Sequence, residues 1–532
     1  MNQIESTLQI KKILGKTWTS FFSRFGKLLP VQIETIPLVL NGQNLIVSSP
    51  TASGKTEAVV APLVEILLRN GDNSDQGLSL VYVSPTRALV NDLYERLAGP
   101  ISELGLSVAV KTGDRPQFDT TNPQSFLLTT PEALDSLICR SPDTLGSVRF
   151  VVLDEIHLVD KTYRGDQLRI LLKRLARLST GGLHYYALSA TLSRPNEIAQ
   201  RYFDNFVIVA VPGSRELEYE LFASLDEALR AARQRKMHKI LLFCNRRREV
   251  EEISGECRAF WPEDRLVVHH GKLDRSVREE SERFMRECQW GLCVATMTLE
   301  IGIDIGDIDV VALYGAPWSV SSLLQRVGRG NRRRGLAIAF GIYRGPEEQL
   351  YLKELFELAK AGAIEDEPYV PDLSVVTQQI FSCLYQNPSG LTGEFFLSLF
   401  SDYCSADEVG LILPHLRKLG YVELRQGRWY ASTRVMDMGD RGAIHSNIPD
   451  ARDYKVIDVT TGTVLGEIST AIVEDVFRIA GKAWKVVRLE GGRIYVSRSK
   501  GGQAPQFGRS SSRGAFSRLL PPELKYTKGG KT

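Results

Sequence analysis

The chain has 532 residues, of which 43% are hydrophobic and 24% are charged, and its net charge is +3. This length exceeds the size of one hydrophobic core, so two to four domains are expected, with the composition of an ordinary soluble globular protein. Seven cysteines without a Cys-x-x-Cys pair argue against a disulfide framework and a thiolate metal site. No apolar segment resembles a signal peptide or spans a bilayer, so we expect a cytoplasmic protein without a membrane partner.

Aromatic residues gather near the N-terminus, at Trp18, Phe21, Phe22 and Phe25, ahead of Gln32. Aromatic side chains at this spacing usually form core, and Gln32 alone would be an exposed helix residue. Their position directly upstream of the next motif favours a second interpretation, in which Gln32 pairs with an adenine edge and Phe25 covers the ring.

A phosphate-binding loop is predicted at Ser49–Glu57, between the apolar run Asn44–Val47 and a helical pattern at Ala58–Leu68. A strand, a tight turn and a helix aim backbone N–H groups at a phosphate chain. Lys55 would reach the β- and γ-phosphates, and Thr56 would place its hydroxyl on Mg²⁺. The Gly-Lys-Thr triplet alone also fits a turn with a solvated lysine. The expected nucleotide contacts here are Thr51, Ala52, Ser53, Gly54, Lys55 and Thr56.

Strand patterns alternate with helical patterns in the next hundred residues, at Leu78–Ser84, Ser107–Thr112, Ser125–Thr130 and Arg149–Leu153. This alternation predicts a doubly wound α/β domain, in which ligands bind at the carboxyl ends of the strands. Polar clusters follow three of these strands and would form a groove for a sugar-phosphate chain. The expected nucleic-acid contacts are Thr86, Arg87, Gly113, Thr130, Pro131 and Glu132.

An acidic pair, Asp154 and Glu155, follows the strand Arg149–Leu153. Beside a phosphate loop, Asp154 is expected to hold Mg²⁺ through water, and Glu155 to orient or deprotonate the attacking water. The alternative is a pair of helix-capping acids. The spacing from Lys55 is ordinary for two strands of one sheet, which favours the catalytic interpretation.

Together with Ser189-Ala190-Thr191, these motifs resemble those of superfamily 2 helicases of the DEAD/DEAH type. The resemblance implies ATP and Mg²⁺ as cofactors, adenine recognition by Gln32, and coupling of hydrolysis to unwinding through Ser-Ala-Thr. Ser49 and Ala52 depart from the commoner Ala and Gly of the loop. The resemblance also implies two tandem RecA-like parallel-sheet domains.

A second α/β series begins at Lys239–Asn245, and its strand ends carry the expected nucleic-acid contacts Asn245, Arg246, Gly271 and Thr296. The family's last two motifs match at Thr296 and Asp304 and at Gln325-Arg326-Val327-Gly328-Arg329 with Arg332. A solvent-facing basic helix is the alternative. The resemblance makes Gly302 and Asp304 nucleotide contacts, Gln325 catalytic, and Arg329 and Arg332 arginine fingers. The spacing of 21 positions from Asp304 to Gln325 leaves no room for a long strand-separating hairpin.

The expected domains are residues 1–212 and 213–365 for the two lobes, 366–434 for a winged helix, and 435–505 for a small β-rich domain. Residues 506–532 are expected to be a basic, flexible tail. From Gly481 to Thr532 the chain has twelve Lys and Arg against two acids. Such a region is either a solvated tail or a phosphate-backbone contact.

The four-part order looks most like the core of the large helicase-related (Lhr) proteins, which carry a much larger fourth domain. The resemblance implies ATP-driven translocation on single-stranded DNA in the 3′-to-5′ direction, in repair or genome defence. The expected partner is single-stranded or partly duplex DNA, with protein partners of a repair or defence complex. An RNA helicase and an ATP-switched clamp subunit without unwinding activity remain alternatives.

Overall fold

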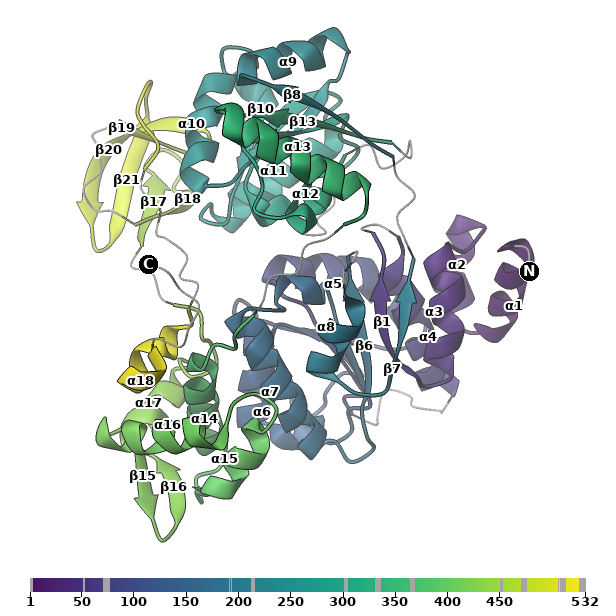
Figure 1. The fold of residues 1–532 in the computed structure, drawn as a ribbon, viewed down its shortest axis with the longest axis vertical. Helices are drawn as coiled ribbons and strands as arrows, with labels where there is room; N and C mark the ends of the chain where they lie inside the picture. The colour runs from purple at the N-terminus through teal and green to yellow at the C-terminus, as the bar shows by residue number, and fades with distance from the viewer. Residues whose placement is uncertain are drawn as a thin grey trace. The chain divides into compact units, whose positions relative to one another are not determined.

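The computed structural model describes residues 3–50, 53–69, 77–190, 192, 194–211, 216–300, 305–330, 336–363, 369–449, 453–469, 476–505, 507 and 513–525. The chain forms two compact units, and each unit is assembled from separate stretches of sequence (Figure 1). Unit 1 comprises Met1–Pro212, Glu367–Asp450 and Ser511–Thr532. Unit 2 comprises Gly213–Asp366 and Ala451–Ser510.

The first lobe, in unit 1, contains a parallel seven-stranded sheet with the order β3-β4-β2-β5-β6-β1-β7. Its strands are β1 (Asn44–Ser48), β2 (Leu80–Val83), β3 (Val108–Lys111), β4 (Phe126–Thr129), β5 (Phe150–Leu153), β6 (His184–Ser189) and β7 (Phe206–Ala210). The central strands are short apolar runs buried on both faces, as parallel sheets require.

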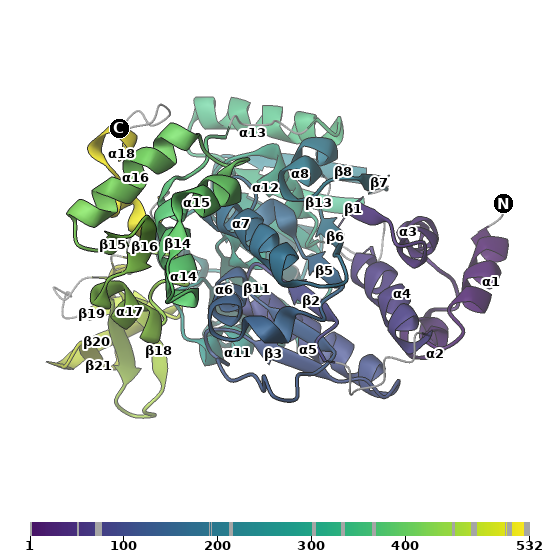
Figure 2. The same ribbon diagram turned by 90° about the horizontal axis from the view of Figure 1, so that it is seen from below.

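Helices cover both faces of this sheet (Figure 2). One hydrophobic cluster joins the sheet to α1 (Gln3–Ile13), α2 (Trp18–Phe22), α3 (Pro30–Leu40), α4 (Lys55–Arg69) and α5 (Arg87–Ser102). A second cluster joins it to α6 (Pro131–Arg140), α7 (Tyr163–Leu178) and α8 (Pro195–Tyr202). The prediction of a doubly wound α/β lobe is confirmed.

A helical domain forms the other part of unit 1. Its elements are α14 (Ser374–Gln386), β14 (Leu391–Thr392), α15 (Gly393–Phe400), α16 (Ala406–Lys418), β15 (Val422–Arg425), β16 (Arg428–Ala431) and α17 (Thr433–Asp440). The strands pair as an antiparallel sheet in the order β14-β16-β15. Helix α14 packs against α6 and α7 of the first lobe, as both views show (Figures 1 and 2). The winged-helix assignment of this domain stays a prediction.

The C-terminal segment differs from the expected flexible tail. Residues 513–525 contain a 3-10 helix at Ala515–Leu519 and the short helix α18 (Pro522–Lys525). Phe516, Leu519 and Leu524 are buried in the hydrophobic cluster of the helical domain. The apolar residues between the basic ones therefore decide the structure of this segment. The helical domain also extends past the expected boundary at 434, because α17 continues it.

The second lobe, in unit 2, has a parallel six-stranded sheet with the order β10-β11-β9-β12-β13-β8. Its strands are β8 (Glu216–Phe222), β9 (Lys239–Cys244), β10 (Leu266–His269), β11 (Gly291–Ala295), β12 (Val310–Tyr314) and β13 (Leu336–Ile342). Its helices are α9 (Leu225–Gln234), α10 (Arg247–Cys257), α11 (Arg275–Glu287), α12 (Val320–Val327) and α13 (Pro346–Lys360). The prediction of a second parallel-sheet lobe is confirmed.

A small β domain completes unit 2, with the strand order β18-β17-β21-β20-β19. Its strands are β17 (Tyr454–Asp458), β18 (Val464–Ile468), β19 (Val476–Ile479), β20 (Lys482–Glu490) and β21 (Arg493–Arg498). Strands β17 and β18 form a hairpin around Gly462, and β20 and β21 form one around Gly491-Gly492. The β domain shares one hydrophobic cluster with the second lobe, which includes Val268 and Trp484. Within the described ranges of the chain, no helix has the length and apolar character to cross a membrane.

Candidate nucleotide and nucleic-acid sites

The predicted phosphate loop lies between β1 and α4, at the carboxyl edge of the first sheet. Lys55 is the first residue of α4 and is buried, and its Nζ donates to the carbonyls of Ser49 at 2.6 Å and Pro50 at 2.9 Å. The ammonium group thus already lies over its own loop. Thr51 and Ala52 lie outside the described residues.

Gln32 contacts the end of this loop. Its Oε1 accepts a hydrogen bond from the Leu29 N–H at 2.9 Å, and its Nε2 lies 3.4 Å from the Gly54 carbonyl. Gly54 has a φ of +82°, and a Cβ there would lie 2.4 Å from Gln32 Nε2. Glycine therefore allows both the left-handed backbone and the close approach of Gln32. Phe25 is 56% exposed, and the Arg24 guanidinium lies 4.7 Å from its ring centroid.

The acidic pair follows β5, which is separated from β1 in the sheet by β6 alone. Asp154 is buried, and burial together with the charge of Glu155 raises the pKa of Asp154 to about 7, although Lys55 opposes this rise. Glu155 has a φ of +41°, a left-handed conformation that costs a residue with a Cβ about 1–2 kcal/mol. Strain of this kind concentrates at functional sites.

His157 links the acidic pair to the end of β6. Its Nδ1 lies 2.9 Å from Ser189 Oγ, 3.4 Å from the Ala190 nitrogen and 3.4 Å from Glu155 Oε2. One imidazole nitrogen therefore touches both the Asp-Glu-Ile-His motif and the Ser-Ala-Thr motif. A displacement of Ser189 would therefore move His157 and change its contact with Glu155. Thr191 lies outside the described residues.

The residues around the loop fit a nucleoside triphosphate with a divalent cation. Ser49 Oγ and Ser53 Oγ are buried and have no hydrogen-bond partner within the described part of the chain, and the buried Glu155 Oε2 has only His157 Nδ1 nearby, at 3.4 Å. Hydroxyl donors suit phosphate oxygens, and an additional cation would offset the charge of two neighbouring buried acids. Thr56 and Asp154 are the residues that would hold Mg²⁺, and such an ion would stabilise the charge of the transferred phosphoryl group.

The residues of the first lobe that are expected to contact nucleic acid lie along the other half of the same edge, where β3, β4 and β2 are neighbours. Thr86 caps α5, and exposed Arg87 forms an ion pair with Asp114 and lies against Gly113. Thr130 and Pro131 are buried at the start of α6. Glu132 forms a two-pronged ion pair with Arg164, with distances of 2.6 and 3.0 Å. Contact at Thr130–Glu132 would therefore come from the backbone at the start of α6, where Glu132 has an N–H group and Pro131 has none.

In the second lobe, the predicted contacts follow three neighbouring strands, β10, β11 and β9. Gly271 and Arg246 are exposed, whereas Thr296 is buried and its Oγ1 lies 3.4 Å from Thr298 Oγ1. Asn245 donates to the Ala316 carbonyl at 2.8 Å and accepts from Arg326 at 2.9 Å. Asn245 is thus held in place within the lobe.

The last motif lies on and after α12. Gln325 and Arg329 are buried, and Arg329 Nη2 donates to the Glu300 carbonyl at 2.7 Å. Arg326 Nε donates to the Glu300 carboxylate at 2.6 Å. Gly302, Asp304 and Arg332 lie outside the described residues. The described residues 305–330 contain β12 and α12 and no hairpin.

Two residues of these sites, Glu300 and Arg326, were not expected from the sequence, and neither was the contact that His157 makes with Ser189. His157 was visible as the fourth residue of Asp-Glu-Ile-His, but its partner Ser189 is 32 residues away. Arg326 stands inside the Gln-Arg-Val-Gly-Arg motif, where charge alone favours a surface position. Only the fold shows that it is buried on Glu300, 26 residues earlier.

Two family comparisons match the two lobes. Residues 29–198 match the DEAD/DEAH box helicase family, and residues 220–334 match the helicase conserved C-terminal domain. The first match contains Gln32, the phosphate loop and the acidic pair, and the second contains Asn245 and the segment from Thr296 to Arg329.

Similar proteins cover most of the chain. It is 28% identical to the ATP-dependent helicase Lhr-Core of Sulfolobus acidocaldarius, over 90% of this chain and 61% of that protein. The chain thus spans about three-fifths of that relative's length. The fold resembles the helicase MrfA bound to DNA and AMPPNP, with a TM-score of 0.74, 19% identity, and 92% and 72% coverage of the two chains. It also resembles Mycobacterium smegmatis helicase Lhr bound to single-stranded DNA and AMP-PNP, with a TM-score of 0.71, 24% identity, and 82% and 62% coverage. The first lobe thus matches the DEAD/DEAH box helicase family, the second lobe matches the helicase conserved C-terminal domain, and the chain is similar to helicases of the Lhr type.

Proposed function

We propose that the chain is an ATP- and Mg²⁺-dependent helicase or translocase that moves 3′ to 5′ along single-stranded or partly duplex DNA. The observation that carries this proposal is the division of one sheet edge. The ends of β1, β6 and β5 bear the phosphate loop, Ser189 and the acidic pair. The ends of β2, β4 and β3 bear the residues expected to contact nucleic acid. One sheet edge would thus carry the proposed nucleotide contacts and the proposed nucleic-acid contacts side by side.

In the proposed reaction, Lys55 leaves the loop carbonyls and binds phosphate oxygens, and Glu155 positions the attacking water. Arg329 and Arg332 of the second lobe stabilise the transition state. When hydrolysis changes the charge or position of the acidic pair, His157 shifts with it and moves Ser189. This contact couples hydrolysis to movement of the nucleic acid. DNA is favoured because the similar Lhr and MrfA structures are of proteins bound to DNA.

The test is steady-state ATPase activity with no nucleic acid, with single-stranded DNA and with single-stranded RNA of the same sequence. Glu155→Gln is the blank, and a strand-displacement assay run beside it separates unwinding from translocation. Stimulation mainly by DNA supports the proposal. Stimulation by RNA alone would assign the protein to RNA remodelling, and no stimulation by either would favour a clamp that depends on a protein partner.

A further inference from the structure

Each lobe has a fully buried acid at the same place relative to its expected strand contacts. Helix α6 begins directly after Thr130, and helix α10 begins directly after Asn245-Arg246. The fifth residue of α6 is Asp135 and the fifth residue of α10 is Glu251, and both have no exposed surface. Each acid therefore lies just over one turn from the residues expected to touch the strand.

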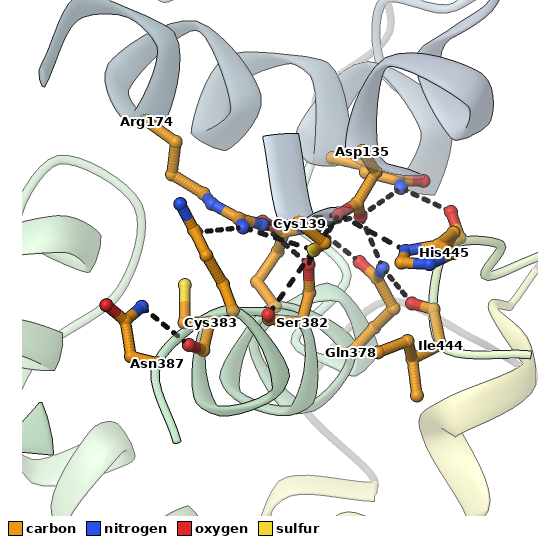
Figure 3. A network of polar contacts seen from close by, with 12 residues as sticks. Asp135, Cys139, Arg174, Gln378, Ser382, Cys383, Asn387, Ile444 and His445 are labelled. Carbon is orange, nitrogen blue, oxygen red and sulfur yellow. Dashed lines mark hydrogen bonds and ion pairs between the residues drawn. The ribbon is translucent and has the colours of Figure 1, made fainter. Parts of the chain in front are cut away.

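Asp135 holds the helical domain onto the first lobe. Its Oδ2 accepts hydrogen bonds from Gln378 Nε2 and Gln379 Nε2, each at 2.7 Å, and from Gln167 Nε2 at 3.0 Å. Its Oδ1 lies 3.3 Å from Arg174 Nη1 and accepts from the hydroxyl of Ser382. Figure 3 shows residues of α14 converging on Asp135 and Arg174, so this helix is fixed to the lobe by a carboxylate with several donors.

This cluster is a structural network and not a metal site. Asp135, Cys139 and His445 offer three ligand atoms within 4.8 Å of one another. Arg174, however, lies against both Asp135 and Cys139, with its Nη2 3.4 Å from Cys139 Sγ. A metal cation there would meet a buried guanidinium, and the carboxylate that would bind it already accepts hydrogen bonds from five nitrogen and hydroxyl donors.

Glu251 holds the β domain onto the second lobe. Its Oε1 lies 3.0 Å from His270 Nε2 and accepts from the Ala480 N–H at 2.9 Å, and its Oε2 accepts from the Gly481 N–H at 2.9 Å. Ala480 and Gly481 form the left-handed turn between β19 and β20. The contact reaches a second strand-contact loop as well, because His270 directly precedes Gly271.

The residue after Gly271 is also held by the β domain. Lys272 forms ion pairs with Asp453 and Glu467, and its carbonyl accepts from the Glu467 N–H at 2.7 Å. Gly271 therefore stands between Lys272, which is bonded to the β domain directly, and His270, which is linked to it through Glu251. Apolar contacts alone would join the domains at lower desolvation cost, whereas a saturated carboxylate permits one geometry.

We propose that Asp135 and Glu251 are positioning residues through which the helical domain and the β domain set the strand-contact loops of their lobes. Each acid fixes the helix whose first turn contacts the nucleic acid. The hydrogen bonds that orient the acid come from the accessory domain of the same unit, which is the helical domain for Asp135 and the β domain for Glu251. The accessory domains thereby determine how tightly each lobe holds nucleic acid. This inference rests on the proposed function.

The test measures ATPase activity against the concentration of single-stranded oligothymidylate, in wild-type chain and in Asp135→Asn, Glu251→Gln and Gln378→Met. We expect Asp135→Asn and Glu251→Gln to raise the half-saturating concentration at least about fivefold, with the nucleic-acid-free rate within about twofold of wild type. Gln378→Met keeps the pair Asp135–Arg174 and removes one donor, so a smaller shift in the same direction is expected. If Asp135→Asn does not fold, Gln378→Met is the variant that tests the inference for unit 1.

Glu65→Gln is the matched control. Glu65 is also buried, and its Oε2 accepts from the Lys16 N–H at 3.0 Å and the Thr17 N–H at 2.9 Å, but it holds the N-terminal segment and no accessory domain. It should lower thermal stability without moving the half-saturating concentration. Wild-type half-saturation in Glu251→Gln and Gln378→Met, or an equal shift in Glu65→Gln, would overturn the inference. A wild-type chain that no nucleic acid stimulates would overturn the proposed function with it.

Discussion

Replacement of Gly54 by alanine should damage the phosphate loop by two separable effects. The backbone at φ +82° is left-handed, which costs alanine about 1–2 kcal/mol. The new Cβ would stand 2.4 Å from Gln32 Nε2, so Gln32 must rotate away and give up its bond to the Leu29 N–H. One lost hydrogen bond adds about 1 kcal/mol, giving a total of about 2–3 kcal/mol for unit 1.

A double-mutant cycle separates the two effects. In a Gln32→Ala background the collision is absent, so Gly54→Ala should cost only the backbone part, about 1–2 kcal/mol. Urea unfolding followed by circular dichroism measures both costs, and nucleotide binding should weaken in Gly54→Ala about as much as in Gln32→Ala. If Gly54→Ala costs the same in both backgrounds, Gln32 does not occupy the space over Gly54 and this reasoning is wrong.

Three further predictions concern other parts of the molecule. Burial lowers the pKa of His445, but Asp135, whose Oδ1 lies 3.7 Å from its Nδ1, and Cys139 outweigh this and raise the pKa to about 9. Protonated His445 should therefore stabilise unit 1 by about 3 kcal/mol below pH 6.5, and this contribution should vanish as the pH rises through 9; unfolding titrations of wild type and His445→Gln should converge above that pH. Phe516→Ala should cost unit 1 about 3–5 kcal/mol because its ring packs at 5.7 Å from Phe381, whereas exposed Arg518→Ala should be nearly neutral in thermal unfolding. Arg329→Ala should lower kcat for ATP by about 10³-fold in saturating nucleic acid, and a change in KM alone would show that Arg329 only binds.

The sequence predicted the two sheets well because each depends on local patterns. Apolar runs such as Phe150–Leu153 and Lys239–Cys244 are strands, and their polar sequels Asp154 and Asn245 lie at the carboxyl ends. The roles assigned to the individual site residues stay predictions.

The sequence could not reveal contacts between distant segments. Asp135 and Gln378 are separated by 243 residues, and Glu251 and Gly481 by 230. A buried acid in an amphipathic helix has the same local signature as an exposed one. The C-terminal segment was misjudged for a related reason: its basic residues indicated a solvated tail, but Phe516 and Leu519 find a hydrophobic cluster whose other members lie in residues 373–444 and at Ile170.

The segments of unit 1 lie on both sides of unit 2 in the sequence, and this order affects how the chain folds during synthesis. Unit 1 begins with the first residues but is closed by residues 513–525, so every residue of unit 2 leaves the ribosome first. At about 5–20 residues per second, the roughly 70 residues that separate Ile444, the last cluster residue of the helical domain, from this segment take about 4–14 s to synthesise. During that interval the pocket that receives Phe516 is open, and the nascent helical domain exposes apolar surface to chaperones until the last segment arrives.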